Sequence, residues 1–506
     1  MISKIVSATY SGIEGKLITV EVDISRGMPS FNLVGLGDTS IKEAKDRVRA
    51  SILNSCFDFP VKRITVNLAP ADIRKEGSLF DLPIALGILN ATNQINYQLD
   101  GDTLFLGELS LFGEIKKIKG ALPIAIEASS KKIKNIVLPT ANYQECASVK
   151  GVMLHPFDSL RQVVNYIEYG EENTIIKNGF KTRENKTESD FEDVYGQESS
   201  KRAIEVAASG FHNIILYGPP GAGKTMLASR VPTILPELSY AESLEVTKIY
   251  SISGNLEDNI GLIQKRPFRA PHHTSTKVAL VGGGSKLNPG EISLAHNGVL
   301  FLDEILEFNK GVLEVLRQPL EERSIKLCRA MGSIVYPANI MLIGAMNPCP
   351  CGNFGSERVC TCSDYERKRY LRKLSSPLMD RIDIISSVKE VSFDALNAKK
   401  GNKSSSEIRY CVEKSRKLQK RRFYNDNIYC NAQMNDVQIE KYCSLDNETK
   451  DFMREVYNKF KLTARAYSRI LKVARSIADL EAREKIEKLD IIEAINYRKF
   501  VDESII

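Results

Sequence analysis

A glycine-rich loop between two regular elements constrains the fold of this chain more than any other feature. The loop reads GPPGAGKT, which satisfies the pattern G-x-x-x-x-G-K-[ST]. It follows NIILY, a run typical of a buried parallel strand, and precedes the helix-forming run MLASRV. Because a strand, this loop and a helix in that order bind phosphate through backbone N–H groups, we predict a parallel α/β nucleotide-binding domain. A chance glycine loop is the less favoured alternative.

Each residue type in the loop has an expected task. Lys224 is expected at the β- and γ-phosphates of ATP, and the Thr225 hydroxyl at Mg²⁺. The residues predicted to bind the nucleotide are Gly218, Pro219, Pro220, Gly221, Ala222, Gly223, Lys224, Thr225 and Asp303.

Two further apolar runs end in polar side chains. GVLFLDE ends in Asp303, expected to hold Mg²⁺, and Glu304, expected to orient or activate the attacking water. NIMLIGAMNP ends in Asn347, whose amide is suited to positioning that water. Surface acids after a strand and an ordinary Asn-Pro turn are the alternatives. The order of loop, acidic strand and polar-tipped strand is that of an AAA+ ATPase.

Two arginines complete the predicted catalytic set. Arg381, in SSPLMDRIDI, is expected to reach the nucleotide of a neighbouring subunit, and Arg465, in TARAYSRIL, to sense nucleotide from a helical lid. Surface ion pairs are the commoner role of arginine and remain the alternative.

The remaining chain suggests a multidomain α/β protein. With 506 residues it is long enough for several domains, and its net charge of +7 permits an acidic partner without requiring one. We predict an α+β domain over 1–168, a linker over 169–190, an ATPase core over 191–395 and a helical lid domain over 396–506. The first contains expected strands such as KLITVEVDI and TLFLGEL. No run is long enough to cross a bilayer and no secretory h-region is seen, so a cytoplasmic protein is expected.

Four of the ten cysteines fall in CPCGNFGSERVCTC, namely Cys349, Cys351, Cys360 and Cys362. Four thiolates in one loop are enough to close a tetrahedral zinc site, but paired zinc ligands usually stand at least two residues apart. The interpretation favours Zn²⁺ and leaves a reduced cysteine-rich loop as the alternative.

The long segment RPFRAPHHTSTKVALVGGGSKLNPGEISLAHNGVLFLDE, with NPCPCG and SSPLMDRIDI, resembles the magnesium-chelatase-like AAA+ family known as ComM or YifB. The resemblance covers essentially the whole chain. It implies an ATP- and Mg²⁺-dependent homo-hexameric ring that acts on single-stranded or branched DNA, as a helicase or branch-migration factor in recombination or natural transformation. A metal-insertion motor like the magnesium chelatase ATPase subunit is the alternative.

The amino-terminal domain resembles the Lon-protease-like version of the ribosomal S5 domain 2 fold. A peptidase needs a nucleophilic serine and an activating lysine. KEGSLFDLP offers Ser78, but the protease nucleophile falls one place later, at Leu79, and Leu122 stands where the lysine would be. We therefore expect a non-catalytic platform rather than an ATP-dependent peptidase.

Basic residues in two loops are the candidate DNA contacts. Lys286 lies in the glycine-rich VGGGSKLNPGE, and Lys326 and Arg329 in a predicted hairpin, ERSIKLCRAMGSIVYPA. Such loops would contact phosphates without reading sequence. RKLQKRRF over 416–423 is either a nucleic-acid patch or a solvated helix face. The adjacent His272 and His273 are expected to be structural or to lie near the nucleotide.

Overall fold

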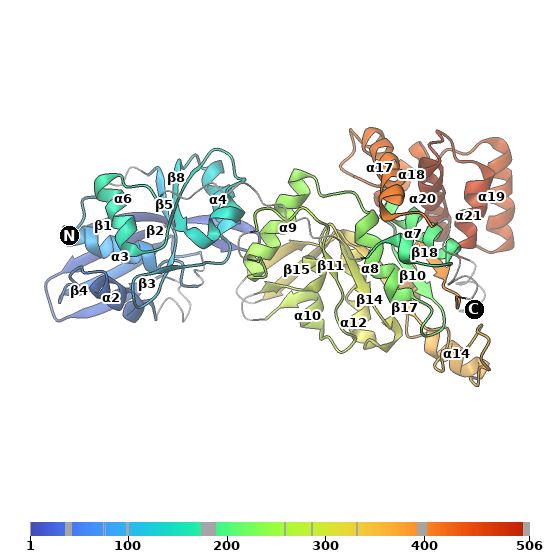
Figure 1. Ribbon diagram of the computed structural model, residues 1–506, viewed down its shortest axis with the longest axis horizontal. Helices are drawn as coiled ribbons and strands as arrows, with labels where there is room; N and C mark the ends of the chain where they lie inside the picture. The colour runs from blue at the N-terminus through green and yellow to red at the C-terminus, as the bar shows by residue number, and fades with distance from the viewer. Residues whose placement is uncertain are drawn as a thin grey trace. The chain divides into compact units, whose positions relative to one another are not determined.

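The structure is a computed structural model with two compact units (Figure 1). It describes residues 2–35, 43–73, 75, 77–97, 101–173, 189–257, 260–284, 287–329, 332–391 and 402–498. One unit comprises 1–183, 240–263 and 330–334, and the other comprises 184–239, 264–329 and 335–506. The expected linker lies mostly outside the described residues.

In its described residues, the amino-terminal unit contains a four-stranded sheet, a three-stranded sheet, the two-stranded β6–β7 ladder and their covering helices (Figure 1). Its strands are β1 (Ile2–Ser11), β2 (Glu14–Ser25), β3 (Ser30–Val34), β4 (Arg63–Ala69), β5 (Thr103–Phe105), β6 (Glu108–Leu109), β7 (Ile115–Lys116), β8 (Asn135–Pro139) and β9 (Met153–Phe157). Its helices are α2 (Ala44–Asn54), α3 (Asp81–Ala91), α4 (Ala121–Ser130), α5 (Tyr143–Cys146), α6 (Leu160–Tyr169) and α9 (Tyr240–Ser253).

The larger of these sheets has the order β1-β2-β4-β3, antiparallel except for β3 beside β4. A second, parallel sheet has the order β5-β8-β9. Along β2, residues alternate between buried and partly exposed, as expected for a strand with one face on the core. Helix α3 packs on β1 and β2, and α4 packs on β2 and α9.

The predicted strand KLITVEVDI lies within β2, which confirms that expectation. The prediction of TLFLGEL as one strand is wrong, because the ladder stops at Phe105. Gly107 turns aside there: its N–H donates to the Leu79 carbonyl at 3.1 Å, and its carbonyl accepts from Leu82 N–H at 3.0 Å. The start of α3 thus takes the backbone groups that a continuing strand would have used.

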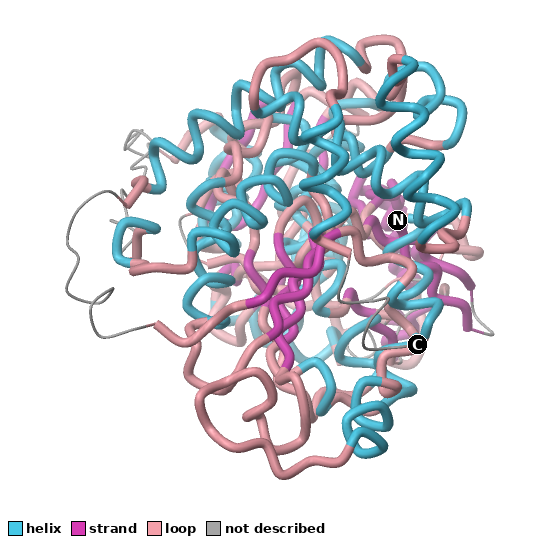
Figure 2. The backbone as a smooth tube through the Cα atoms, turned by 90° about the vertical axis from the view of Figure 1, so that its right-hand side faces the viewer, coloured by secondary structure: helices cyan, strands magenta, loops and turns pink. Residues whose placement is uncertain are grey.

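The second unit is built on a five-stranded parallel sheet with the order β11-β14-β17-β10-β18. Figure 2 shows helices on either side of these central strands. Its strands are β10 (Ile214–Tyr217), β11 (Phe268–Arg269), β12 (Gly282–Gly283), β13 (Asn288–Pro289), β14 (Val299–Leu302), β15 (Ser324–Arg329), β16 (Gly332–Pro337, whose first residues group with the other unit), β17 (Met341–Met346) and β18 (Ile384–Ser387).

The helices of this unit precede, interleave with and follow the sheet. They are α7 (Glu198–Gly210), α8 (Lys224–Ile234), α10 (Lys277–Val281), α11 (Glu291–Leu294), α12 (Lys310–Glu314), α13 (Arg317–Glu322), α14 (Asp364–Leu371), α15 (Ser376–Met379), α17 (Ser405–Arg422), α18 (Asp436–Tyr442), α19 (Asn447–Lys459), α20 (Ala464–Leu480) and α21 (Lys488–Asn496). Short 3₁₀ turns in the described residues of this unit are η2 (Phe191–Asp193), η3 (Ile305–Glu307) and η4 (Asn431–Gln433), and η1 (Thr140–Asn142) lies in the amino-terminal unit.

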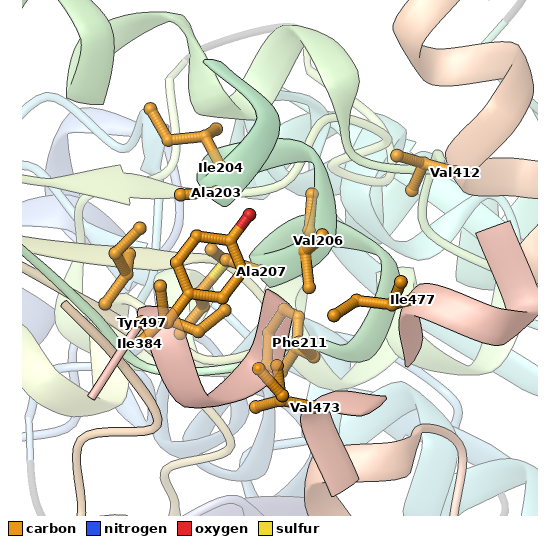
Figure 3. Close-up of a cluster of buried hydrophobic side chains, with 14 of the residues drawn as sticks. Ala203, Ile204, Val206, Ala207, Phe211, Ile384, Val412, Val473, Ile477 and Tyr497 are labelled. Atoms are coloured by element: carbon orange, nitrogen blue, oxygen red, sulfur yellow. The ribbon is translucent and has the colours of Figure 1, made fainter. Parts of the chain in front are cut away.

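One hydrophobic core joins the sheet to the carboxy-terminal helices. Figure 3 shows part of this core, with Val206 of α7, Ile384 of β18, and Val473 and Ile477 of α20 among its side chains. All four side chains are buried, and burying such a side chain contributes about 1.5–3 kcal/mol. The helical region therefore shares the core of the five-stranded parallel sheet. Among the described residues, no helix combines the length and apolar character needed to cross a membrane.

Candidate nucleotide site

The phosphate loop joins the end of β10 to the start of α8. Gly221 and Gly223 have φ values of +80° and +91°, which glycine adopts without strain. Gly218 is required for a different reason, since a Cβ there would lie 2.0 Å from the carbonyl oxygen of Val388. The loop therefore passes directly against the chain that leaves β18.

Lys224 stands at the first position of α8 with its ammonium group turned back into the loop. Its Nζ donates to the carbonyl oxygens of Gly218 at 2.7 Å and Pro219 at 2.9 Å, and to Asn347 Oδ1 at 3.1 Å. Burial lowers the pKa of Lys224, and the charges of Asp303 and Glu304 oppose that shift. The ammonium group is held at the mouth of the loop. There, phosphate oxygens of a bound nucleotide would replace these carbonyl oxygens as its hydrogen-bond acceptors.

The polar ends of three neighbouring strands meet at this loop. In register, Leu302 of β14 lies beside Gly344 of β17, and Met346 of β17 beside Tyr217 of β10. Parallel strands bring their carboxyl ends to one edge, where ligands bind in open α/β sheets. Thus the predicted residues that follow β10, β14 and β17 are brought together.

A hydroxyl and a carboxylate at this edge fit a magnesium ion. The Thr225 hydroxyl donates to Asp303 Oδ2 at 2.8 Å, so the two oxygen groups predicted to hold Mg²⁺ are already adjacent. Oxygen ligands of this kind, with substrate phosphates, are what Mg²⁺ takes in such sites. The donor set therefore fits ATP with Mg²⁺.

Glu304 is held in an uncommon backbone conformation next to Asp303. Its φ is +48°, and its N–H donates to Asp303 Oδ1 at 2.9 Å. Residues other than glycine seldom adopt this left-handed conformation, and those that do are often found at functional sites. Its carboxylate is largely solvent-exposed, and its Oε2 lies 4.0 Å from Nδ1 of His273.

The sequence does not predict His273 as a partner of Glu304. The rings of His272 and His273 stack with centroids 4.1 Å apart, and His272 Nδ1 lies 2.9 Å from the Thr274 hydroxyl. Of the two roles expected for these histidines, the contact of His273 with Glu304 favours the one near the nucleotide. Only the fold joins residues 31 positions apart, so no local pattern pointed to this pair.

Arg381 and Arg465 lie together, in a cavity whose lining includes no residue of the phosphate loop. The cavity has a volume of about 620 Å³ and also takes basic side chains from Arg323, Arg469 and Lys472. Arg381 donates to the Pro377 carbonyl at 2.6 Å and pairs with Glu321, and Arg465 lies 3.5 Å from Asp380. Both arginines thus have surface partners within the chain.

Asn213, just before β10, connects this cavity to the sheet. Its side-chain amide donates to the carbonyl of Arg381 at 2.9 Å, and its Oδ1 accepts from Leu342 N–H of β17 at 2.9 Å. Its own carbonyl accepts from Asp383 N–H at 3.0 Å. One side chain therefore ties the backbone of Arg381 to the strand that carries Asn347.

The four clustered cysteines come together just after Asn347. Their Sγ atoms all lie within 4.8 Å of one another, with Cys349–Cys360 and Cys351–Cys360 at 3.7 Å and Cys349–Cys351 at 3.3 Å. A tetrahedral zinc ion with Zn–S bonds of about 2.3 Å separates its sulfurs by about 3.8 Å. The C-x-C spacing is therefore compatible with four converging thiolates.

The candidate DNA contacts are only partly described. Lys326 and Arg329 are exposed on β15, which pairs with β16 as the predicted hairpin, whereas Lys286 lies outside the described residues. In the basic run over 416–423, Arg422 is paired with the buried Asp479 at 2.7 Å and Phe423 is buried. That aromatic ring is not available to stack on a base, which favours the solvated-face interpretation of the run.

The amino-terminal unit shows no serine–lysine pair at the expected positions. Leu79 is 3% exposed and Leu122 is fully buried, and the Ser78 hydroxyl donates to Glu108. These two leucines belong to the packed interior of the unit.

Comparison with known proteins extends this picture. The family model described as magnesium chelatase, subunit ChlI, matches residues 190–396; models for subunit ChlI of Mg-chelatase and for the ChlI C-terminal region match 20–142 and 402–498. The chain is thus a magnesium-chelatase-like AAA+ ATPase, a class of ATP- and Mg²⁺-dependent enzymes.

Full-length relatives define the family more closely. The chain is 41% identical over 500 residues to competence protein ComM of Haemophilus influenzae, covering 98% of this chain and 97% of that protein. It is 40% identical over 489 residues to the YifB protein of Escherichia coli K12, covering 96% and 95%. The chain belongs to the ComM/YifB family. A weaker match, 27% over 185 residues, is to Lon protease 2 of Bacillus subtilis, covering 32% and 33%.

Proposed function

We propose that the protein is an ATP-hydrolysing ring motor that acts on DNA, as a helicase or branch-migration factor in recombination or natural transformation. The observation that carries this proposal is the 41% identity with a competence protein over nearly the whole of both chains. The exposed basic side chains of Lys326 and Arg329 support contact with a phosphate backbone. A cytoplasmic location follows, because ATP and DNA are both present there.

Within one subunit, the chain's own residues divide the work of hydrolysis. Bound ATP with Mg²⁺ supplies the phosphoryl group and the charge that neutralises its oxygens. Lys224 binds and orients phosphate, Thr225 and Asp303 hold the ion, and Glu304 and Asn347 orient the attacking water.

A shared site between subunits is part of the proposal. Arg381 lines a cavity that contains no residue of the phosphate loop. We therefore expect Arg381 to contact the transition state bound in the phosphate loop of a neighbouring copy. Arg465 lines the same cavity, and we assign it the same direction, toward the neighbour's nucleotide rather than its own. A homo-hexameric ring satisfies this arrangement because each interface then pairs one loop with one arginine face.

DNA-dependent activity is the main test. ATP hydrolysis is measured with single-stranded, duplex and four-way junction DNA, together with strand separation of a forked substrate. We expect stimulation by single-stranded or branched DNA and unwinding that needs ATP. A Glu304→Gln protein that still unwinds, or an ATPase indifferent to every DNA, would contradict the proposal.

The basic side chains of the hairpin have a separate signature in DNA binding. Replacing Lys326 and Arg329 by alanine should weaken binding alike for all sequences. The slope of log affinity against log salt should fall by about 1 for each side chain that no longer neutralises a phosphate. Lys417 and Lys420, exposed on α17, provide the matched control. An unchanged slope in the β15 variant would remove the hairpin from the interface.

The second candidate is a metal-insertion motor, favoured by the ChlI models that match three parts of the chain. Its test is metal chelation into a porphyrin in the presence of the partner subunits of such an enzyme. In the motor proposal, the first unit is a non-catalytic S5 domain 2-like domain. The carboxy-terminal helices form the lid.

We also propose that Cys349, Cys351, Cys360 and Cys362 bind one Zn²⁺. The convergence of four sulfurs at spacings close to those of a tetrahedral site supports it. Elemental analysis of the purified protein should give one zinc per chain, and a value near zero would contradict the site.

A further inference from the structure

The cysteine loop, defined here as residues 349–362, lies between two predicted catalytic groups in the chain. It begins two residues after Asn347, and the segment that follows it, with α14 and α15, leads to Arg381. Its conformation therefore bears on both ends of the hydrolytic machinery.

Very little apolar packing holds this loop. Phe354 is 44% exposed and Val359 is 83% exposed, and of the four cysteines only Cys349 is buried. Short segments without an apolar interior are usually fixed by disulfides or metals. All four cysteines are free thiols, so a metal bound by the converging sulfurs could fix the loop, beside the contact of the Arg367 guanidinium with the Phe354 ring.

The loop touches the phosphate loop directly. Gly352 is buried with φ +82°, and a Cβ there would lie 2.7 Å from Cδ of Pro220. Its N–H donates to the Cys349 carbonyl at 3.0 Å, which closes the turn between the first two cysteines. The turn from Cys349 to Gly352, which a bound metal would hold closed, is therefore the turn that packs against Pro220.

A second contact reaches the acidic turn after β14. Ser363, directly after Cys362, caps α14, and from that helix the Tyr370 hydroxyl donates to Glu307 Oε1 at 3.2 Å. Lys373 lies 3.5 Å from the other carboxylate oxygen of Glu307. The Glu307 N–H in turn donates to the carbonyl of Glu304, the proposed catalytic glutamate, at 2.7 Å. Tyr370 and Lys373 are therefore connected to Glu304 through Glu307.

We infer that metal bound by the four cysteines braces the nucleotide site, so that zinc loading sets the rate of ATP hydrolysis. The inference rests on the proposed ATPase and zinc site. The brace acts on Pro220, Asn347 and the Glu304 turn, none of which the metal touches. Its loss should therefore lower kcat more than it raises the KM for ATP.

The test uses the full-length protein with Cys360→Ser and Cys362→Ser, the two ligands farther along the loop. We expect zinc content to fall and kcat to drop about 10-fold or more, the scale usual for support around a metal. Cys328→Ser, an exposed cysteine outside the cluster, should retain zinc and kcat. Variants that lose zinc yet keep full kcat would overturn the inference.

Chelation of the wild-type protein covers the case in which the serine variants fail to fold. Removing the metal should lower kcat, and adding Zn²⁺ back should restore it. Trypsin cleavage after the exposed Arg358 should accelerate in parallel, which reports the loop without reference to activity. Unchanged cleavage and unchanged kcat on chelation would refute the brace.

Two substitutions test the contacts with zinc still bound. Tyr370→Phe removes the hydroxyl that bonds Glu307, and Gly352→Ala forces a methyl group against Pro220. Both should lower kcat with zinc content unchanged, Gly352→Ala by more. Because these assays use basal hydrolysis, an absence of DNA stimulation would refute the motor proposal and leave the brace standing.

Discussion

The two units of this protein both bury extensive apolar cores, and they differ in the residues that stand where each fold could carry out chemistry. In the ATPase unit, β10, β14 and β17 are followed by Gly218, Asp303 and Asn347. In the amino-terminal unit, the protease positions hold Leu79 and Leu122, both buried. The comparison teaches that a fold supplies places for chemistry, and that the side chains at those places decide whether chemistry occurs.

The largest expected effect lies in the ATPase unit. Lys224→Ala removes the cation that would meet the phosphates, and kcat/KM for ATP should fall at least about 100-fold, the usual consequence of losing one stabilising donor. Ser78→Ala, in the amino-terminal unit, should leave steady-state ATP hydrolysis unchanged. Equal losses in the two variants would break the comparison.

Arg381→Ala should lower kcat by about 100-fold or more, because an arginine on the transition-state charge contributes strongly. Mixing this variant with Lys224→Ala provides the sharper result. Some interfaces of mixed rings would pair an intact loop with an intact arginine, so ATPase activity should reappear. A mixture as inactive as its components would argue for an arginine acting within its own subunit.

In the amino-terminal unit, the charges that matter are structural. Asp81 is buried and accepts from Arg47 Nε at 2.8 Å, so Arg47→Ala leaves its carboxylate with the Leu109 N–H at 3.3 Å but without its cationic partner. We expect a loss of about 3–5 kcal/mol in the free energy of unfolding, with the kcat for ATP of the folded protein unchanged. The exposed pair Lys134–Asp102 is the control, since Lys134→Ala should cost less than about 1 kcal/mol in chemical denaturation.

The smallest expected effect is none at all. Casein incubated with the protein and ATP should remain intact, and Ser78→Ala should not change that result, because no lysine stands at the position of Leu122 to activate a nucleophile. ATP-dependent cleavage that disappears in Ser78→Ala would reverse the assignment of the amino-terminal unit.

The sequence predicts those features that are written locally. The β10 strand, the turn of glycines and the α8 helix follow from adjacent residues, and so do β14 before Asp303 and β17 before Asn347. The break in TLFLGEL escapes such prediction because its cause is a bond from Gly107 to Leu79, far along the chain. Local patterning cannot report such tertiary competition for backbone groups.

The relations between motifs lie beyond the sequence for the same reason. Nothing in APHHTST indicates that His273 faces Glu304, and nothing in NPCPCG indicates that Gly352 backs Pro220. The segment with α9 follows α8 in the chain but packs on α4 within the amino-terminal unit. Spacing predicts which residues have chemistry to offer, whereas packing decides which of them meet.

Asn213 links two parts of the molecule that are proposed to serve different nucleotide sites. Its amide hydrogen-bonds the backbone of Arg381, which would contact the nucleotide of a neighbouring subunit. The same amide also bonds β17, and Asn347 after that strand would contact the nucleotide of the same subunit. In the proposed ring, Asn213 would therefore couple hydrolysis at adjacent sites without belonging to the phosphate loop. Changing it should alter the cooperativity of hydrolysis around a ring before it alters the chemistry at any one site.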